Sequence, residues 1–254
     1  MFKNEIEAVG NTARGKVGLL EKNPFGYVLM SFLAGLYIAF GSILMGIVGG
    51  NMAGEPMQKL ICGIIFSVGL CLVTVAGAEL FTGNNFVMAV GSLTGTVSWG
   101  KTIKLWVVCY IGNLLGSVVG AAVFTATGIM SNEAVGTFLT STAAAKMAGT
   151  PLNLFAKAVL CNVLVCLAIW CGAKLKSEGA KIAMNFCCVA TFVACGFEHS
   201  IANMTFMSIG LMNPHDAAVN FGGFFYNLGI VTLGNMIGGI LLVAVPYYLI
   251  SKDK

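Results

Sequence analysis

Six apolar stretches, each long enough to cross a lipid bilayer as a helix, constrain this chain more than any other feature. About 20 helical residues span the hydrocarbon core of a membrane, and no alternating strand pattern typical of a barrel is present. Of the 254 residues, 57% are hydrophobic and only 9% are charged. We therefore predict an all-α membrane protein with six transmembrane helices, at residues 26–50, 57–94, 103–128, 153–173, 182–210 and 224–250.

The basic residues are distributed unevenly between the segments that join these stretches. With the N-terminus in the cytoplasm, 11 of the 14 lysines and arginines fall in cytoplasmic segments, and only Lys59, Lys146 and Lys157 fall outside. Cytoplasmic loops of membrane proteins carry such an excess, so both termini are predicted to be cytoplasmic. The same bias explains the formal net charge of +4, and no nucleic-acid partner is expected.

The first 24 residues resemble neither a membrane span nor a signal peptide, since they lack a long apolar core and a cleavage site. Their apolar residues recur at intervals of three or four, with the charged residues elsewhere on the helical wheel. This pattern predicts a cytoplasmic interfacial helix. It leaves open whether that helix is a surface anchor or a mobile gate.

All nine cysteines lie within the apolar stretches. We interpret them as small buried hydrophobic residues, because they show no CxxC spacing and no pattern of a secreted disulfide framework. Only two histidines are present, too few for a membrane haem with paired ligands on facing helices. No metal and no cofactor are therefore expected, and the chain is not expected to be an enzyme.

The second and fifth stretches share a polar interruption. GAELFTGN at 77–84 and GFEHSIAN at 196–203 both read G-x-E-x-x-x-x-N, offset by 119 residues. Because each half holds three spans, the halves have opposite topologies, which predicts an inverted repeat. Within a single channel domain of residues 1–254, residues 26–128 form the first half-repeat and 153–250 the second.

The two interruptions predict broken helices near the membrane midplane. Irregular backbone at that depth is tolerated only inside protein or beside a wet cavity, and the N-termini of half-helices suit an anion. Thr82, Gly83 and Asn84 are predicted to form a turn and cap before a half-helix that begins near Asn85, and Ser200 is predicted to cap the second half-helix.

Glu79 and Glu198 occupy equivalent places in the repeat. A buried carboxylate can accept several backbone N–H bonds from a non-helical loop and hold its shape. We therefore predict a loop-structuring role for both glutamates.

Three segments, AELFTGNNF, LCNVLVCLAIW and FVACGFEHSIANM, resemble the formate/nitrite transporter family, and the resemblance covers essentially the whole chain. It implies six-helix protomers with an aquaporin-like fold, assembled as homopentamers in a bacterial inner membrane, with one pore per protomer. It implies passage of small monovalent anions such as formate, nitrite and hydrosulfide. The compact loops and the LFTGNN form look closest to the hydrosulfide-channel branch.

The resemblance also implies which residues line the pore. His199 would bind the ion, with Thr82 and Asn162 facing it. The inner constriction would consist of Leu70, Leu80 and Phe192. The outer constriction would consist of Phe66, Phe81 and Val165. Lys146 would be a basic residue of the outer vestibule.

An ionisable side chain at membrane depth, such as His199, is a functional candidate by default, and a narrowing lined by leucine and phenylalanine excludes hydrated ions. Asn162 could serve the pore or a helix contact. Lys146, in the polar segment 129–150, could raise the anion concentration at the mouth or be a plain solvated charge.

Two further transport mechanisms stay open. An aquaporin-type channel for neutral solutes would need an Asn-Pro-Ala motif at each break, but the chain has only NPH at 213–215. Proton-coupled symport of formate or nitrite through His199 is compatible with the same architecture.

Overall fold

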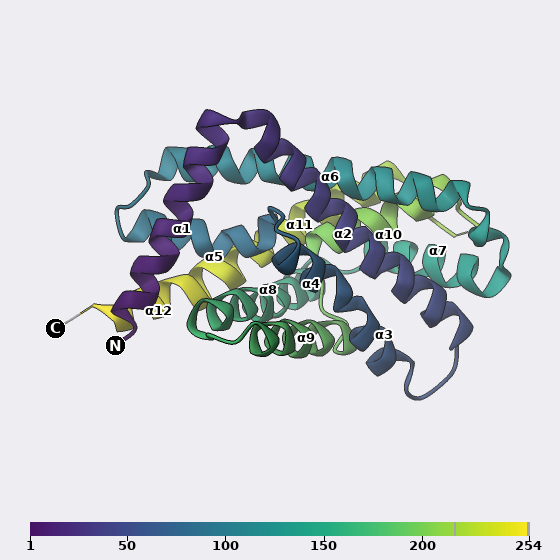
Figure 1. Cartoon of the computed structure of the whole chain (residues 1–254). Coiled ribbons are helices and arrows are strands. Elements are labelled where there is room, and N and C mark those ends of the chain that lie inside the picture. The colour runs from purple at the N-terminus through teal and green to yellow at the C-terminus, as the bar shows by residue number, and fades with distance from the viewer. Residues whose placement is uncertain (216, 253–254) are drawn as a thin grey trace.

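A computed structural model describes residues 1–215 and 217–252 (Figure 1). All regular structure in this part of the chain is helical. The elements are α1 (Lys3–Lys22), α2 (Pro24–Asn51), α3 (Gln58–Phe66), α4 (Val68–Val75), α5 (Phe81–Leu93), α6 (Trp99–Ala126), the short 3-10 helix η1 (Ile129–Ser131), α7 (Glu133–Ala148), α8 (Pro151–Lys174), α9 (Glu178–Ala194), α10 (Ser200–Met212), α11 (Phe221–Gly239), the π-helical turn η2 (Ile240–Ala244) and α12 (Val245–Ser251).

The helical segments reproduce the predicted spans. Five of them are long and apolar enough to cross a membrane, at 24–51, 58–75, 99–126, 151–174 and 221–251. The remaining span, which is the fifth in chain order, consists of α9, a loop and the short apolar helix α10. The prediction of an all-α membrane fold in which the second and fifth spans are broken is therefore confirmed.

Side-chain caps set where several of these helices begin. The Asn23 side chain accepts a hydrogen bond from the backbone N–H of Gly26 (2.9 Å), and Pro24 occupies the first helical position of α2. Such a cap satisfies one of the otherwise unpaired N–H groups of the first turn. Equivalent caps start α6, α7, α9 and α11, from Ser98, Asn132, Ser177 and Asn220.

The two halves pack in corresponding ways. In the first half, a Cβ at Gly116 of α6 would clash with the backbone carbonyl of Phe32 in α2. In the second half, a Cβ at Gly238 of α11 would clash with the carbonyl of Val159 in α8. Only glycine permits this approach of two backbones, which is how membrane helices gain packing energy. The helices α2 and α6 thus form one close pair in the first half, and α8 and α11 form the corresponding pair in the second half.

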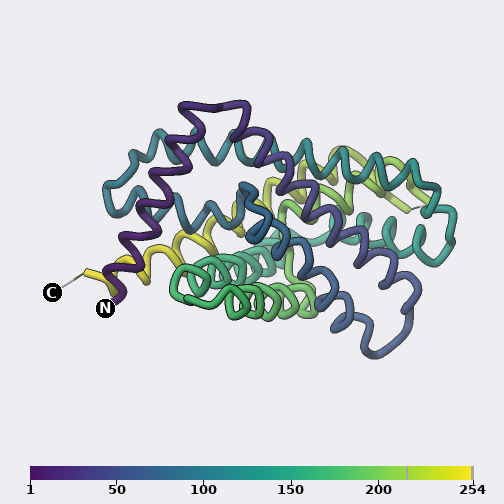
Figure 2. The backbone as a smooth tube through the Cα atoms, viewed as in Figure 1, coloured from purple at the N-terminus to yellow at the C-terminus, as the bar shows by residue number. Residues whose placement is uncertain are grey.

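The described ends of the chain lie at one end of the molecule, beside α1 and α12, whereas α7 and the turn between α2 and α3 lie at the opposite end (Figures 1 and 2). Helix α1 crosses α5, where its Ala13 approaches Gly91 so closely that a Cβ on the glycine would lie 2.5 Å from the Ala13 Cβ. The apolar face of α1 is therefore covered by the protein itself, with Ile6, Val9 and Val17 buried.

The segment 129–150, interpreted from the sequence as a polar connection, contains α7. Its helix starts at the Asn132 cap, and Val135, Leu139 and Met147 are buried on one face. Many small polar residues separate these apolar positions, which is why the segment looks like a loop. This helix brings Lys146 to the fifth-span loop.

Candidate functional site

Two short loops interrupt the second and fifth spans at equivalent places. Each begins with a glycine in the left-handed region, Gly77 (φ 79°) and Gly196 (φ 70°), a conformation that other residues adopt only with strain. Each ends with an extended residue, Leu80 or His199, that precedes a new helix. The loops therefore place the N-termini of α5 and α10 inside the protein.

The half-helices start earlier than predicted. Helix α5 begins at Phe81, so Thr82, Gly83 and Asn84 lie in its first turns instead of forming a turn before Asn85. The prediction was wrong because Gly77 already makes the reversal and the chain is extended again at residue 80.

The predicted cap of α10 was also wrong. His199 is the N-cap, and its Nδ1 accepts the backbone N–H of Ala202 (3.1 Å). Ser200 is the first helical residue, and its buried hydroxyl has no hydrogen-bond partner among the described residues.

Asn113 of α6 holds the first loop. Its Oδ1 accepts the backbone N–H of Phe81 (2.9 Å), and its Nδ2 donates to the carbonyl of Glu79 (2.8 Å) and to that of Ser31 in α2 (2.7 Å). One buried amide thus satisfies loop backbone groups on both sides of Leu80, and those groups would otherwise be costly at this depth.

Asn235 of α11 holds the second loop in the same manner. Its Oδ1 accepts the N–H of Ser200 (2.9 Å), and its Nδ2 donates to the carbonyls of Glu198 (2.9 Å) and Ala158 (2.8 Å). The sequence interpretation missed both asparagines. The available signal was the motif G-N-x-x-G, which occurs at 112–116 and again at 234–238.

Glu79 stabilises its loop through side chains. Its Oε1 accepts a bond from Lys16 Nζ of α1 (2.5 Å), and its Oε2 accepts bonds from Asn84 Nδ2 (2.8 Å) and from the Tyr27 hydroxyl (3.1 Å). The sequence predicted backbone N–H donors, but Asn113 satisfies the neighbouring loop groups. Lys16 was not singled out from the sequence.

Glu198 repeats this arrangement. Its Oε2 accepts bonds from Lys146 Nζ (2.9 Å) and from Asn203 Nδ2 (2.7 Å). Here too, side chains replace the predicted backbone donors, because Asn235 bonds the loop backbone. The glutamate and the asparagine of each G-x-E-x-x-x-x-N copy therefore bond to each other, and each glutamate forms an ion pair with a lysine from another helix. The Lys146 side chain is only 14% exposed, so it is not a plain solvated charge.

Thr82 and His199 meet where the two half-helices begin. Thr82 Oγ1 lies 2.9 Å from His199 Nε2, and both residues are buried. Because His199 Nδ1 accepts the N–H of Ala202, the neutral ring carries its proton on Nε2, which then donates to Thr82. The partial positive charges of both helix N-termini reinforce this donor-rich position.

Asn162 anchors the same region from α8. Its Nδ2 lies within hydrogen-bond distance of the carbonyls of Thr82 (3.3 Å) and Asn235 (2.7 Å) and of Asn85 Oδ1 (3.1 Å). The donor hydrogens of this amide are thus directed at protein acceptors. The geometry gives Asn162 a positioning task at the start of α5.

Two cavities lie near the Thr82–His199 contact, one lined by His199 itself and the other by Gly83, the residue after Thr82. The first, which we name the α7 cavity, has a volume of about 440 Å³ and is lined by residues that include Lys146, Glu198, His199, Phe66 and Phe192. The second, the α1 cavity, has a volume of about 300 Å³ and is lined by residues that include Lys16, Glu79, Asn84, Leu70 and Leu80. The helices after which they are named lie at opposite ends of the molecule (Figure 1).

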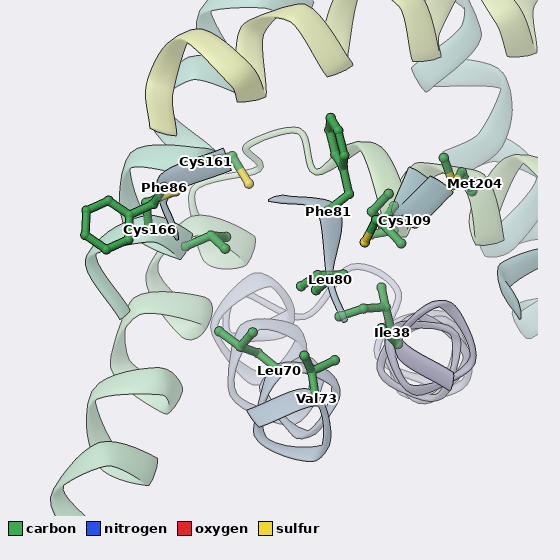
Figure 3. Close-up of a cluster of buried hydrophobic side chains, with 14 of the residues drawn as sticks. Ile38, Leu70, Val73, Leu80, Phe81, Phe86, Cys109, Cys161, Cys166 and Met204 are labelled. Atoms are coloured by element: carbon green, nitrogen blue, oxygen red, sulfur yellow. The ribbon is translucent and has the colours of Figure 1, made fainter. Parts of the chain in front are cut away.

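The structure brings together two of the three residues of the predicted inner constriction. Leu70 and Leu80 both line the α1 cavity, and Figure 3 shows Leu80 directed towards Leu70 and Val73. Phe192, predicted to lie beside these leucines, instead lines the α7 cavity, where its ring packs against Phe66 (centroids 6.1 Å apart). It also stacks on His199 (5.8 Å). The reason is its position in the last turn of α9, directly before the loop that carries His199.

Phe81 and Val165 are not among the residues that line either cavity. The Phe81 ring packs edge-to-face on Tyr110 (4.9 Å) and points away from Leu70 (Figure 3). Val165 is buried in α8. Among the described residues, no group of three or more histidine, cysteine, aspartate or glutamate side chains could hold a metal ion.

Residues 3–249 match the family model described as formate/nitrite transporter. The nitrite transporter NirC of Salmonella typhimurium is 35% identical over 249 residues, covering 98% of this chain and 91% of the relative. Two solved structures are similar. An FNT family ion channel has a TM-score of 0.93, 33% identity and coverage of 99% and 100% of the two chains. A pentameric formate channel with formate bound has a TM-score of 0.80, 32% identity and coverage of 91% and 98%.

Proposed function

The chain belongs to the formate/nitrite transporter family, and from this premise we propose that it is a passive channel for small monovalent anions. Hydrosulfide is the favoured permeant in this proposal, with formate or nitrite close behind. The names of two similar proteins support transport of small monovalent anions, since one is a nitrite transporter and the other is a formate channel with formate bound. The preference for hydrosulfide rests on the compact loops and the LFTGNN form of the sequence.

The single observation that carries the proposal is the contact between Thr82 and His199. An anion entering from either cavity meets a buried position with the Nε2–H of His199, the hydroxyl of Thr82 and two helix N-termini. Such donors replace part of the hydration shell that the anion sheds. A cation would find no carboxylate there, because Glu79 and Glu198 are each engaged by a lysine.

The charge of the α7 cavity supports anion entry. Lys59, Lys146 and Lys157 line this cavity, and Glu198 is the one carboxylate among its described lining residues. Clefts with an excess of one charge raise the local concentration of counter-ions. Lys146 thus acts as a vestibule residue while it also holds the Glu198 carboxylate.

Apolar side chains support selection by size and hydration. Phe66 and Phe192 narrow the path on the α7 side, and Leu70 and Leu80 narrow it on the α1 side. An ion must lose water to pass apolar walls and gains little from them. Small, weakly hydrated anions therefore pass at the lowest cost, and large or strongly hydrated ions are excluded.

We further propose that the functional unit is a homopentamer in a bacterial inner membrane, with one pore per protomer and both termini in the cytoplasm. The similarity to a pentameric formate channel supports this assembly. Large apolar side chains exposed at every fourth position of α6 provide a surface for lipid or for a neighbouring protomer, at Ile103, Val107, Ile111, Leu115 and Val119.

Flux into proteoliposomes that contain the purified protein tests the function. Hydrosulfide, formate, nitrite and chloride are compared at clamped membrane potential, with glycerol as a neutral control. We expect hydrosulfide, formate and nitrite to pass and hydrosulfide to pass fastest. Movement of glycerol alone would overturn the anion channel and favour an aquaporin-type pore.

A second flux experiment separates the channel from proton-coupled symport. The anion concentrations inside and outside are equal, and only a pH gradient is imposed at clamped potential. A passive channel for the anion gives no net flux of formate or nitrite. Net flux driven by the proton gradient would establish the symporter, a reading that the buried His199 keeps open.

A further inference from the structure

A third cavity, outside the transport path, lies where α1 meets the end of the last span. It has a volume of about 510 Å³, and we name it the Arg14 cavity. Three cationic side chains from three places in the chain line it: Lys3 at the start of α1, Arg14 in its middle and Lys252 after α12. The side chains of Thr94, Thr96 and Ser251 also line it.

Among its described lining residues, this cavity has more cationic than acidic side chains. Glu7 is the one carboxylate among the lining residues that the structure describes. Within residues 1–215 and 217–252, no carboxylate forms an ion pair with Arg14 or Lys252. The Lys252 ammonium instead lies over the Tyr248 ring, 4.6 Å from its centroid. Arg14 and Lys252 thus converge on one cavity while no described carboxylate pairs with either, and this arrangement indicates an anionic ligand.

The geometry of the cavity depends on close packing beneath it. A Cβ at Gly10 of α1 would lie 3.0 Å from Thr96 Oγ1 and 3.2 Å from Thr94 Oγ1. These hydroxyls bond to each other at 2.9 Å, which fixes the turn that forms the cavity floor. Helix α1 is therefore held against this turn, and Arg14 stands one turn further along the same helix.

The location favours a ligand at the membrane surface. Helix α12 ends the last span, and Leu249 and Ile250 on it are exposed apolar residues. Headgroups of the surrounding lipid lie at the level where such a helix leaves the hydrocarbon core. Arginine and lysine in basic pockets between membrane helices bind the phosphates of anionic lipids.

We propose that the Arg14 cavity binds the phosphate group of an anionic ligand and so fastens α1 to α12. Arg14 contributes a planar guanidinium that can donate two bonds to one phosphate, and Lys252 and Lys3 add positive charge. Glu7 opposes binding by like-charge repulsion. An anionic phospholipid and a soluble phosphate ester share this recognition chemistry.

Lipid binding to the purified full-length protein in neutral detergent tests the proposal, with phosphatidylglycerol titrated and bound lipid counted by native mass spectrometry. Zwitterionic phosphatidylcholine serves as the lipid control. Each cation near a phosphate contributes about fivefold in affinity, so the double variant Arg14→Gln/Lys252→Gln should bind phosphatidylglycerol about 30-fold more weakly. Glu7→Gln should bind it about three- to fivefold more tightly, a gain that misfolding cannot produce.

A matched control removes two charges from the same end of the molecule without touching the cavity. Lys22 and Lys104 are exposed and line none of the three cavities, so Lys22→Gln/Lys104→Gln should retain wild-type affinity. Equal affinity of the Arg14/Lys252 variant and the wild type, or an equal loss in the control, would overturn the proposal.

Competition identifies the source of the phosphate. If sn-glycerol 3-phosphate or inorganic phosphate displaces phosphatidylglycerol at millimolar concentration, a soluble phosphate can occupy the site. If neither displaces it while the variants behave as expected, the ligand is the lipid. These experiments measure lipid binding and not anion flux. A negative result would therefore overturn the lipid site without bearing on the proposed channel function.

Discussion

The Nε2 atom of His199 lies 2.9 Å from the Oγ1 atom of Thr82, and this contact joins the N-cap of α10 to the first turn of α5. No other described side chain bonds His199 Nε2. Among the described side chains, the Thr82 hydroxyl is therefore the one hydrogen-bond partner of the His199 Nε2 atom.

Removal of that hydroxyl should impair transport more than folding. Thr82→Val keeps the shape of the side chain but leaves the buried Nε2–H of His199 without an acceptor. We expect anion flux in proteoliposomes to fall about tenfold, with a cost in unfolding free energy of about 1–3 kcal/mol. Thr82→Ser, which retains the hydroxyl, should keep flux within about twofold of wild type. Wild-type flux and selectivity in Thr82→Val would remove Thr82 from the pore.

The two ring nitrogens of His199 have separable tasks. Asparagine is a good N-cap residue, so His199→Asn can replace the bond from Nδ1 to Ala202 N–H. His199→Ala loses the cap and should destabilise the protein by about 1 kcal/mol more than the asparagine variant. Both lose the Nε2 donor, and both should lose anion selectivity. Thermal unfolding and the hydrosulfide-to-chloride flux ratio check this; a selective His199→Ala channel would contradict the ion-binding role.

Asn113 and Asn235, which hold the two loops, should contribute more to the free energy of unfolding than other buried asparagines. Asn113→Ala removes three hydrogen bonds and strands buried backbone groups, so we expect a loss of about 3 kcal/mol or more. Asn185→Ala is the control, because the Asn185 amide donates one bond, to Thr74, and should cost about 1 kcal/mol. Thermal unfolding in detergent measures both. Similar melting temperatures for the two variants would disprove the holding role of Asn113.

Lys146 and Glu198 should be strongly coupled. Their side chains are 14% and 9% exposed, and removal of one partner leaves the other buried without its counter-charge, at a cost of about 3 kcal/mol. A double-mutant cycle with Lys146→Met and Glu198→Gln should show the double variant to be more stable than the sum of the single changes implies. The pair Lys181–Glu178, with Glu178 mostly exposed, should show less than about 1 kcal/mol. If the changes in unfolding free energy at Lys146 and Glu198 were additive, the ion pair would contribute little to stability.

Phe192 and Phe81 should respond differently to truncation. Phe192→Ala removes a wall of the α7 cavity beside His199, so larger anions such as acetate should permeate at least about fivefold faster relative to formate. Phe81→Ala should leave this ratio unchanged and should instead cost about 3–5 kcal/mol, because its ring packs on Tyr110 away from both cavities. The opposite pattern would restore Phe81 to the constriction.

Local patterns predicted much of this architecture. Runs of apolar residues indicated the six spans, and the repeated G-x-E-x-x-x-x-N indicated where two of them break. The start of α5 was misplaced because Thr82, Gly83 and Asn84 are typical turn residues, yet the tight reversal occurs earlier, at Gly77. Phe192 lines the α7 cavity and not the one lined by Leu70 and Leu80, a placement that the sequence of its helix alone does not show.

The sequence by itself determined that this chain is a membrane protein of two related halves, because hydropathy, repeat spacing and motif content are local properties of a chain. Only the tertiary structure decided which lysine neutralises each loop glutamate, which asparagine satisfies each loop backbone and which aromatic ring faces each cavity. Lys16 and Glu79 are 63 residues apart, and Asn113 and Ser31 are 82 apart. Such partners are selected by the packing of whole helices, since a buried polar group is stable only beside a group that packing brings within hydrogen-bond distance.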